Sequence, residues 1–409
     1  MATFYWIAAS AGNASDEANW SGTGVPDTPD TIIFNSTNSV EDCTMDIAEV
    51  TTLTMQRTYT GTITLDNGFT VSGDLTITAG TVDTGADKAL TVGGTLFLMP
   101  ERDGGGTDPD AILICNGSDI TAGELESWGV WDSGGYDPKC VFTGGTGDHE
   151  YGKLTFIVGT NVVLSSGITE LTGAGAAFRS GAQIAYNTYD NGGGTVKFTS
   201  ASDQWVYSTS AAADDFKQFY NLILEKTTST LQGLSTVGFH IRVENDLTIT
   251  SGILNTKTTS PTLADHDLTV GGTTTIGSAD ASAVDEATLI TNESAIDLQG
   301  TDGSTPGLLM LAGGTYNGVA DADQSIGSVK ALVTTYNSKI YFTSGTTTIY
   351  QEEAGNNCLR IDSTTDVNFY HGNGTVEITT PTYARLHCYE PFYNLTINHA
   401  GSVGNKIAL

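Results

Sequence analysis

Short runs in which apolar residues alternate with Thr recur along the chain, with Gly, Asn or Asp between them. Examples are residues 52–55, 62–65, 74–77 and 89–92. Alternation with a period of two residues, bounded by turn residues, predicts short strands joined by turns. No segment of helical length separates these runs, so we expect almost no helix.

A longer repeat contains these short strands. Four segments return in the same order further along the chain: 73–80 as 245–252, 90–95 as 268–273, 194–199 as 374–379 and 219–222 as 392–395. The spacings are nearly equal, at 172, 178, 180 and 173 residues (245 − 73, 268 − 90, 374 − 194 and 392 − 219). Short strands nested in long repeats are typical of an all-β parallel β-solenoid, or β-helix, in which each coil stacks on the previous one. A row of antiparallel β-sandwich modules is the alternative, although no Pro-rich linkers separate the repeats.

The spacing of the repeats predicts the organisation of the chain. We expect an N-terminal cap over residues 1–49, a first solenoid module over 50–218, a second over 219–391 and the start of a third over 392–409. Each coil should take about 20 to 25 residues. The third copy stops at Leu409. Two explanations stay open: the natural chain continues, or another subunit completes the last coil.

Aromatic residues are concentrated before the repeats begin. Trp6 and Trp20 lie in the segments Tyr-Trp and Asn-Trp-Ser. The end of a solenoid exposes unpaired strand edges above an apolar core, and these edges promote aggregation unless they are covered. We therefore expect Trp6 and Trp20 to form an aromatic cap.

The order of these N-terminal motifs carries a resemblance. Trp, Asn-Trp-Ser, Val-Pro and Asp-Thr-Ile-Ile-Phe come first, and repeats of the Leu-Thr-Val/Ile kind follow. This order resembles the β-helical fibre and appendage proteins of tailed phages, and also the β-helical passenger and adhesin-like proteins of bacterial surfaces. The resemblance covers most of the chain and implies a structural role. It carries no catalytic residues over to this sequence.

Charge excludes two classes of partner. The 409 residues include 16 Lys and Arg against 47 Asp and Glu, which gives a formal net charge of −31. Nucleic acids and anionic membrane surfaces would repel such a chain. No stretch approaches the ~18 apolar residues that a membrane span needs. We expect neither nucleic-acid binding nor membrane insertion.

The five cysteines are too few for a disulfide scaffold and odd in number. We expect buried free thiols. The alternative is that two pairs, Cys115 with Cys140 and Cys358 with Cys388, stack on neighbouring coils, because each pair is separated by about one coil.

No motif in the sequence indicates catalysis. Asp214 and Asp215 form the only adjacent Asp pair, and neither the Gly-His-Gly nor the Arg-Ile-Lys triplet of polygalacturonases occurs. Glycan-cleaving β-helices need several carboxylates on one strand face. The sequence therefore predicts a protein that is not an enzyme. Glycan cleavage is the least favoured of the three functions that we consider, after a virion appendage and a surface adhesin.

Metal binding has little support. The six histidines show neither His-x-His nor His-x3-His spacing, and no phosphate-binding loop is present. Three Asp-x-Asp turns, at 108–110, 265–267 and 321–323, could supply oxygen ligands to Ca²⁺. Solvated acidic turns are the preferred interpretation, so we expect no cofactor.

An irregular loop interrupts the repeats over residues 99–140. It contains Trp128, Trp131 and Tyr136 among Gly, Ser and Asp. Aromatic side chains on a loop can stack on sugars, so these three residues are the candidate ligand-binding group. Alternatively, they pack the loop onto the solenoid or fill a subunit contact, and we prefer this interpretation.

A repeated body, an aromatic cap and no convincing catalytic motif together predict a structural rod. We expect a virion appendage, namely a phage tail fibre, spike or capsid-surface fibre, that assembles with other structural subunits in multiple or homo-oligomeric copies. No basic segment precedes the apolar run at the start of the sequence, which favours a virion over an exported surface protein. A bacterial cell-surface adhesin or passenger fragment is the alternative. A host-surface glycan is a further expected partner.

Overall fold

The computed structural model describes residues 1–100, 110–129, 140–157, 159–180, 188–208, 219–234, 241–257, 266–279, 286–301, 305–318, 320, 322–331, 338–351, 357–361, 367–379, 384–398 and 407–408. Just over half of these residues (56%) lie in strands, and the described part of the chain has one 3₁₀ turn, η1 (Glu17–Asn19), and no α-helix. Their paired strands are parallel. The predicted parallel β-solenoid is confirmed, and the antiparallel sandwich is wrong.

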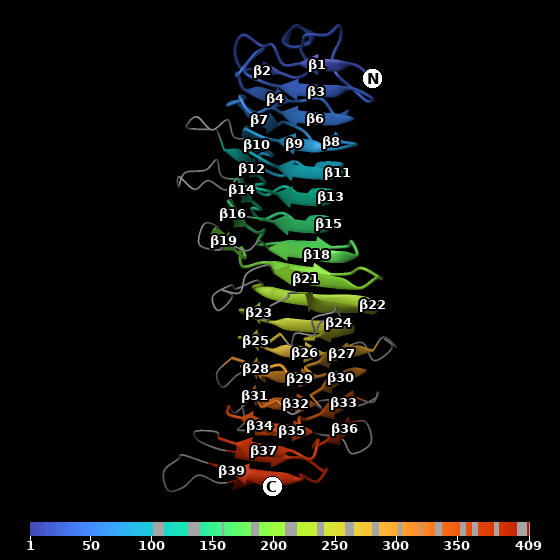
Figure 1. The fold of residues 1–409 in the computed structure, drawn as a ribbon, viewed down its shortest axis with the longest axis vertical. Helices are drawn as coiled ribbons and strands as arrows, with labels where there is room; N and C mark the ends of the chain where they lie inside the picture. The colour runs from blue at the N-terminus through green and yellow to red at the C-terminus, as the bar shows by residue number, and fades with distance from the viewer. Residues whose placement is uncertain are drawn as a thin grey trace. The chain divides into compact units, whose positions relative to one another are not determined.

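The chain forms two compact units, which we call unit 1 (Met1–Thr195 with Ser208–Ser210) and unit 2 (Val196–Tyr207 with Ala211–Leu409). Within each unit, a typical coil contributes one strand segment to each of three faces (Figure 1). The boundaries of the repeat modules remain predictions.

One face of unit 1 is an eight-stranded sheet. It contains β2 (Gly12–Asn13), β4 (Cys43–Met45), β7 (Thr62–Leu65), β10 (Gly80–Asp83), β12 (Ala111–Ile114), β14 (Cys140–Thr143), β16 (Thr160–Val163) and β19 (Thr188–Asp190). The second face contains β5 (Glu49–Val50), β8 (Phe69–Val71), the first halves of β11 (Leu90–Leu98), β13 (Ile120–Ser127) and β15 (His149–Phe156), and β17 (Ile168–Leu171). The third contains β1 (Thr3–Tyr5), β3 (Thr31–Phe34), β6 (Thr52–Met55), β9 (Leu75–Ile77), the second halves of β11, β13 and β15, and β18 (Gly175–Ser180).

Unit 2 has the same plan. Its seven-stranded sheet contains β23 (Ile241–Val243), β25 (Leu268–Val270), β28 (Ile296–Leu298), β31 (Gln324–Ile326), β34 (Thr346–Ile349), β37 (Thr375–Ile378) and β39 (Asn394–Ile397). The second face contains the first halves of β22 (Asn221–Leu234) and β24 (Leu247–Asn255), then β26 (Thr274–Ile276), β29 (Leu308–Met310), β32 (Val329–Ala331), β35 (Asn357–Ile361), β38 (Ala384–His387) and β40 (Ile407–Ala408). The third contains β21 (Gln204–Ser208), the second halves of β22 and β24, then β27 (Ala287–Ile290), β30 (Gly314–Asn317), β33 (Ser338–Tyr341) and β36 (Val367–Tyr370).

The core consists of columns of inward side chains. In unit 1, one column consists of the buried residues Leu53, Leu75, Leu96, Leu125 and Leu154, which lie opposite one another on successive strands. Alternate residues point outward and are mostly Thr or charged, as the period-two pattern predicts. The side chains stay aligned in these columns even where a coil exceeds the expected length of about 20 to 25 residues. The additional residues of such a coil therefore lie between strands.

Aspartates at the coil corners join each coil to the next. The Oδ1 atom of Asp74 accepts the backbone N–H of Thr95 at 2.9 Å. The Oδ1 atom of Asp246 accepts that of Thr273 at 2.8 Å. These residues belong to two of the repeated segments, so the repeats encode matching contacts between coils. Equivalent bonds join Asp42 to Thr62, Asp119 to Asp148, Asp148 to Ile168, Asp203 to Thr230, Asp267 to Ala295 and Asp323 to Thr346.

A second corner repeats in the two units, in residues that the sequence comparison did not match. The side-chain amide of Asn116 donates to Asp83 Oδ1 at 2.6 Å, and that of Asn292 donates to Asn255 Oδ1 at 2.7 Å. Both donors have left-handed backbone, with φ of 47° and 48°, which Asn tolerates better than most residues. Thr84 Oγ1 donates to Cys115 O and Thr256 Oγ1 to Thr291 O at the same corners.

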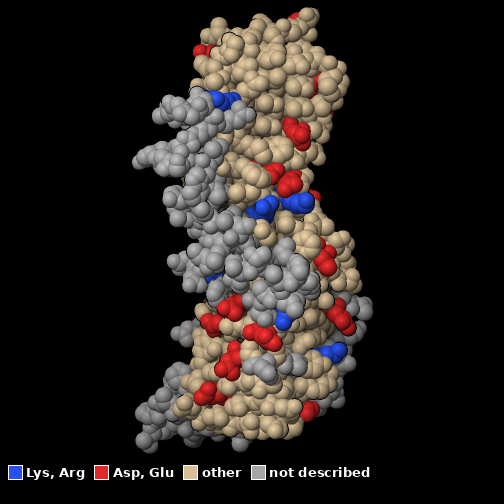
Figure 2. Space-filling view, in the orientation of Figure 1, with Lys and Arg blue, Asp and Glu red and all other residues tan. Residues whose placement is uncertain are grey.

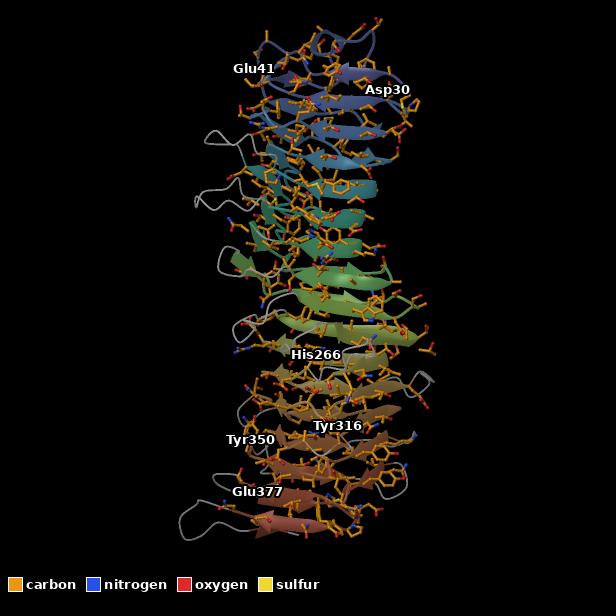
Figure 3. All side chains as sticks on the ribbon, in the orientation of Figure 1. Asp30, Glu41, His266, Tyr316, Tyr350 and Glu377 are labelled. Carbon is orange, nitrogen blue, oxygen red and sulfur yellow. The ribbon has the colours of Figure 1, made fainter. Side chains whose placement is uncertain are left out.

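Trp6 and Trp20 lie in the first coil of unit 1 and are 0% and 2% exposed. Their ring centroids are 5.1 Å apart, and both rings lie within 6 Å of Phe34. The backbone carbonyl of Glu41 accepts the indole N–H of Trp6 at 3.0 Å and the hydroxyl of Tyr59 at 2.8 Å. Glu41 is labelled in Figure 3. The aromatic residues therefore form a closed, hydrogen-bonded cluster at the start of the unit 1 core.

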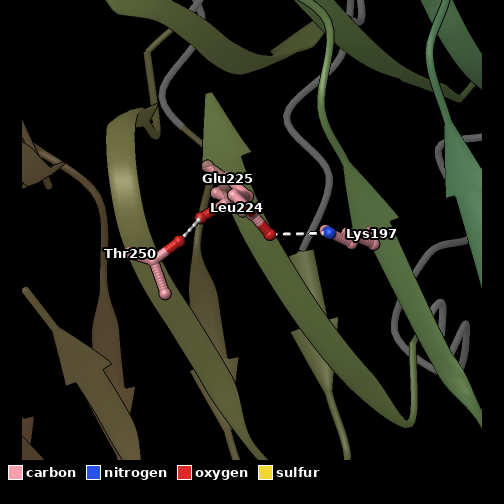
Figure 4. A network of polar contacts seen from close by, with 4 residues as sticks. All are labelled: Lys197, Leu224, Glu225 and Thr250. Atoms are coloured by element: carbon pink, nitrogen blue, oxygen red, sulfur yellow. Dashed lines mark hydrogen bonds and ion pairs between the residues drawn. The ribbon is translucent and has the colours of Figure 1, made fainter. Parts of the chain in front are cut away.

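Three neighbouring strands of unit 2 are joined by polar side chains (Figure 4). Lys197 Nζ of β20 (Thr195–Phe198) lies 2.6 Å from Glu225 Oε2 of β22, and Thr250 Oγ1 of β24 donates to Leu224 O at 3.0 Å. The Glu225 side chain is largely exposed. Water screens such an ion pair, so it contributes at most about 1 kcal/mol.

The adjacent residue, Lys226, is fully buried. It donates to Ser200 O at 2.9 Å, Ser202 O at 3.0 Å and Gln204 Oε1 at 2.6 Å. Burial lowers the pKa of Lys226 to about 8, and the negative charge of Asp203 opposes this shift. The ammonium group thus joins the segment 200–204 to β22.

All five cysteines are free, and four are buried, as predicted. The alternative of stacked pairs is wrong: Cys140 lies opposite Ala111, not Cys115. His387 lies opposite Arg360, so Cys388 follows the end of its strand pairing and does not face Cys358.

We predict that Asp74→Ala lowers the free energy of unfolding by about 0.5–1.5 kcal/mol, because the backbone N–H of Thr95, where the second half of β11 begins, loses its acceptor. Asp66→Ala, at an exposed turn of the same unit, is the control and should change it little. A Cβ on Gly94 would lie 2.2 Å from Asp74 Oδ1, so Gly94→Ala should also destabilise. Denaturant unfolding of both single variants and the double variant tests the contact: purely additive losses would contradict it.

We expect Trp6→Ala to lower the free energy of unfolding by about 3–5 kcal/mol, because it opens a cavity in the aromatic cluster. Trp128→Ala is the matched control, since that indole is 42% exposed, and should cost less than about 0.5 kcal/mol. Equal losses in thermal and denaturant unfolding of the two variants would show that the cluster does not stabilise unit 1.

Lys226 should make stability depend on pH. The folded protein loses this proton near pH 8, whereas the unfolded chain keeps it until about pH 10.5. The free energy of unfolding of the wild type should therefore rise, relative to Lys226→Met, between pH 8 and pH 10.5. Lys339→Met, at an outward position of β33, is the control for the loss of one lysine side chain. A difference that is flat or falls over this range would contradict the buried-cation assignment.

Candidate functional site

The outer face of the seven-stranded sheet in unit 2 contains an open hollow of about 680 Å³, which we call the sheet hollow. Its lining includes the carboxylates Asp267, Asp297, Asp323 and Glu377, the hydroxyls Thr269, Ser325, Thr346 and Thr348, and the ring of Tyr350. Figure 3 places Tyr350 and Glu377 on the same side of unit 2. Acidic side chains gather on this part of unit 2 in Figure 2.

Strand register builds the hollow from residues far apart in the sequence. Thr269, Asp297, Ser325, Thr348 and Glu377 lie opposite one another on the successive strands β25, β28, β31, β34 and β37. Neighbouring strands are about 4.8 Å apart. Asp297 and Glu377, three strands apart, are therefore separated by about 14 Å along the sheet. The result is a straight column of hydrogen-bonding groups.

The Tyr350 side chain is hydrogen-bonded to this column. Its hydroxyl donates to Asp297 Oδ1 at 3.0 Å, and the side-chain amide of Gln299 donates to Asp297 Oδ2 at 2.7 Å. Burial and the charge of Asp297 raise the pKa of the Tyr350 phenol. The phenol therefore stays neutral and keeps its proton on this bond, which holds both the ring and the carboxylate in place.

Two other carboxylates of the hollow also stabilise the coils. Asp267 Oδ1 accepts the N–H of Ala295 at 2.9 Å, and Asp323 Oδ1 accepts that of Thr346 at 2.9 Å. The described residues that line the hollow include no Lys or Arg. The surface therefore accepts hydrogen bonds from neutral hydroxyl groups and repels anions.

The described residues contain no group of three or more His, Cys, Asp or Glu side chains that could hold a metal ion. Of the Asp-x-Asp turns, Asp108, Asp265 and Asp321 lie outside the described residues. Asp267 and Asp323 from two of these turns line the sheet hollow and accept backbone N–H groups.

The predicted aromatic loop is only partly described. Trp128 follows β13, its backbone N–H donates to Leu98 O at 3.0 Å, and its indole N–H donates to Glu126 Oε1. Trp131, Tyr136, Asp214 and Asp215 lie outside the described residues. The candidate group Trp128, Trp131 and Tyr136 therefore remains a prediction.

The sequence analysis did not select Tyr350, Asp297 or Glu377. Tyr350 and Asp297 are 53 residues apart and belong to no local motif. The sequence shows only that each of them lies at an outward position of an alternating strand. Because the coils differ in length, the register between strands must be known before these residues can be assigned to one column.

The described part of the chain contains no helix with the length and apolarity of a membrane span. Comparisons of the chain with protein-family models, with curated proteins and with solved structures found no match.

Proposed function

We propose that the protein is a non-enzymatic structural rod of a virion, such as a phage tail fibre, spike or capsid-surface fibre, used in assembly and host-surface attachment. The main support is the coil-to-coil stacking within each unit, where apolar columns and corner aspartates join successive coils. A chain built this way places most of its ordered residues in a repeated scaffold.

The chemistry of the buried groups supports a structural role. Burial raises the pKa of the Cys43 and Cys115 thiols, which keeps them protonated and unreactive. Burial lowers the pKa of His149 to about 4, and its ring lies in the core beside Tyr151. In the sheet hollow, Asp267 and Asp323 accept hydrogen bonds from the next coil, and Asp297 accepts one from Tyr350, which follows a strand two places along the sheet.

A bacterial cell-surface adhesin or passenger fragment is the second candidate, because it would need the same repeated scaffold. The partners we propose are other structural subunits, including further copies of this chain, and a host-surface glycan. The net charge of −31 would keep densely arrayed copies soluble and away from nucleic acid. The proposed location is the virion surface, with the cell surface as the alternative.

Immunogold electron microscopy of the native source tests this proposal. Antibody against the purified chain should label virions or their appendages. Label confined to the cell envelope, or an export signal encoded upstream, would overturn the virion assignment in favour of the adhesin. Loss of viscosity when the protein is incubated with a panel of host polysaccharides would overturn both, since it would reveal a glycan-cleaving enzyme.

A further inference from the structure

The sheet hollow has the shape of a site for a linear ligand. It is open to solvent, and its polar column extends across strands β25 to β37. Its volume of about 680 Å³ is within the usual range for ligand sites, and polar groups at fixed spacing can select a ligand. A ligand that follows the column meets a new hydrogen-bonding side chain about every 4.8 Å.

The lining combines two features that suit a sugar. Carboxylates and hydroxyls, such as Asp297, Ser325 and Thr348, accept hydrogen bonds from ligand hydroxyl groups. The ring of Tyr350 supplies an apolar surface for the C–H faces of a pyranose. The bond from Tyr350 to Asp297 holds the ring before any ligand arrives, so little ordering is needed on binding.

The negative charge of the lining restricts the kind of sugar that the sheet hollow can bind. The lining residues that the structure describes include no Lys or Arg but four carboxylates: Asp267, Asp297, Asp323 and Glu377. A carboxylate-bearing or phosphorylated sugar would meet like charges at close range. An uncharged sugar would meet acceptors for its hydroxyl protons.

We infer that the sheet hollow binds an uncharged, hydroxyl-rich glycan chain lying along the strand-stacking direction, with Tyr350 and Asp297 at its centre and Glu377 near one end. This inference rests on the proposed attachment function and assigns it to specific residues. It places the glycan site on the sheet face of unit 2 instead of the aromatic loop at 99–140.

Calorimetric titration and glycan-array binding of the full chain test this inference, with neutral, sialylated and phosphorylated oligosaccharides as probes. Neutral chains should bind and acidic ones should not. Tyr350→Ala should weaken neutral binding at least tenfold. Tyr350→Phe, which keeps the ring but loses the bond to Asp297, should weaken it less. Glu377→Gln should weaken neutral binding less than Tyr350→Ala does and should reduce the rejection of acidic chains.

Glu150→Gln, at an outward position of β15 in unit 1, is the control and should bind as the wild type does. Unchanged thermal unfolding of each variant establishes that the fold is intact. No neutral binding by the wild type, or wild-type binding by Tyr350→Ala, would overturn the inference. Loss of binding in Trp128→Ala alone would move the site to the loop. Virion labelling without glycan binding would overturn only this inference, whereas envelope labelling with glycan binding would overturn only the virion assignment.

Discussion

Parallel pairing of successive coils in register is the constraint on which the rest of the structure depends. Each residue lies opposite its counterpart on the next strand, so equivalent positions in successive coils have the same environment, either buried or exposed. A side chain at an inward position must be suited to burial. In unit 1, five successive strands have leucine at one such position. The unequal coils retain this register because the connections between strands absorb the extra residues.

The corner aspartates give part of the negative charge a structural role. Asp74 and Asp246 satisfy backbone N–H groups that would otherwise lose an acceptor at the beginning of a strand segment. The glycines opposite them leave room for the carboxylate: a Cβ on Gly94 or Gly272 would lie 2.2 Å or 2.4 Å from its oxygen. The repeated segments 73–80 and 90–95 are therefore two halves of one contact, which explains why both return in unit 2.

Hydrogen bonds also join buried polar side chains inside unit 2. The Tyr316 hydroxyl donates to Gln324 Oε1 at 2.6 Å, and the Gln324 amide donates to Thr291 Oγ1 at 2.9 Å. Tyr316 and His266, labelled in Figure 3, are both fully buried. Buried polar groups of this kind are tolerated where neighbouring coils supply partners at fixed positions. The bond from Gln324 to Thr291 joins two coils and makes the core of unit 2 specific in its register, because a slipped coil would lose it.

Local and periodic patterns in the sequence are sufficient to predict the fold class and the repeat. The period-two alternation of 52–55 and 74–77 indicates strands, and the ordered return of four segments indicates coils, because both signals are local or periodic. Trp6 and Trp20 are buried in an aromatic cluster, and their predicted role as a cap over the strand edges stays a prediction. The tertiary structure alone decided which outward residues meet. Tyr350, Asp297 and Glu377 form one column because register aligns coils of different length, and no spacing in the chain encodes that alignment.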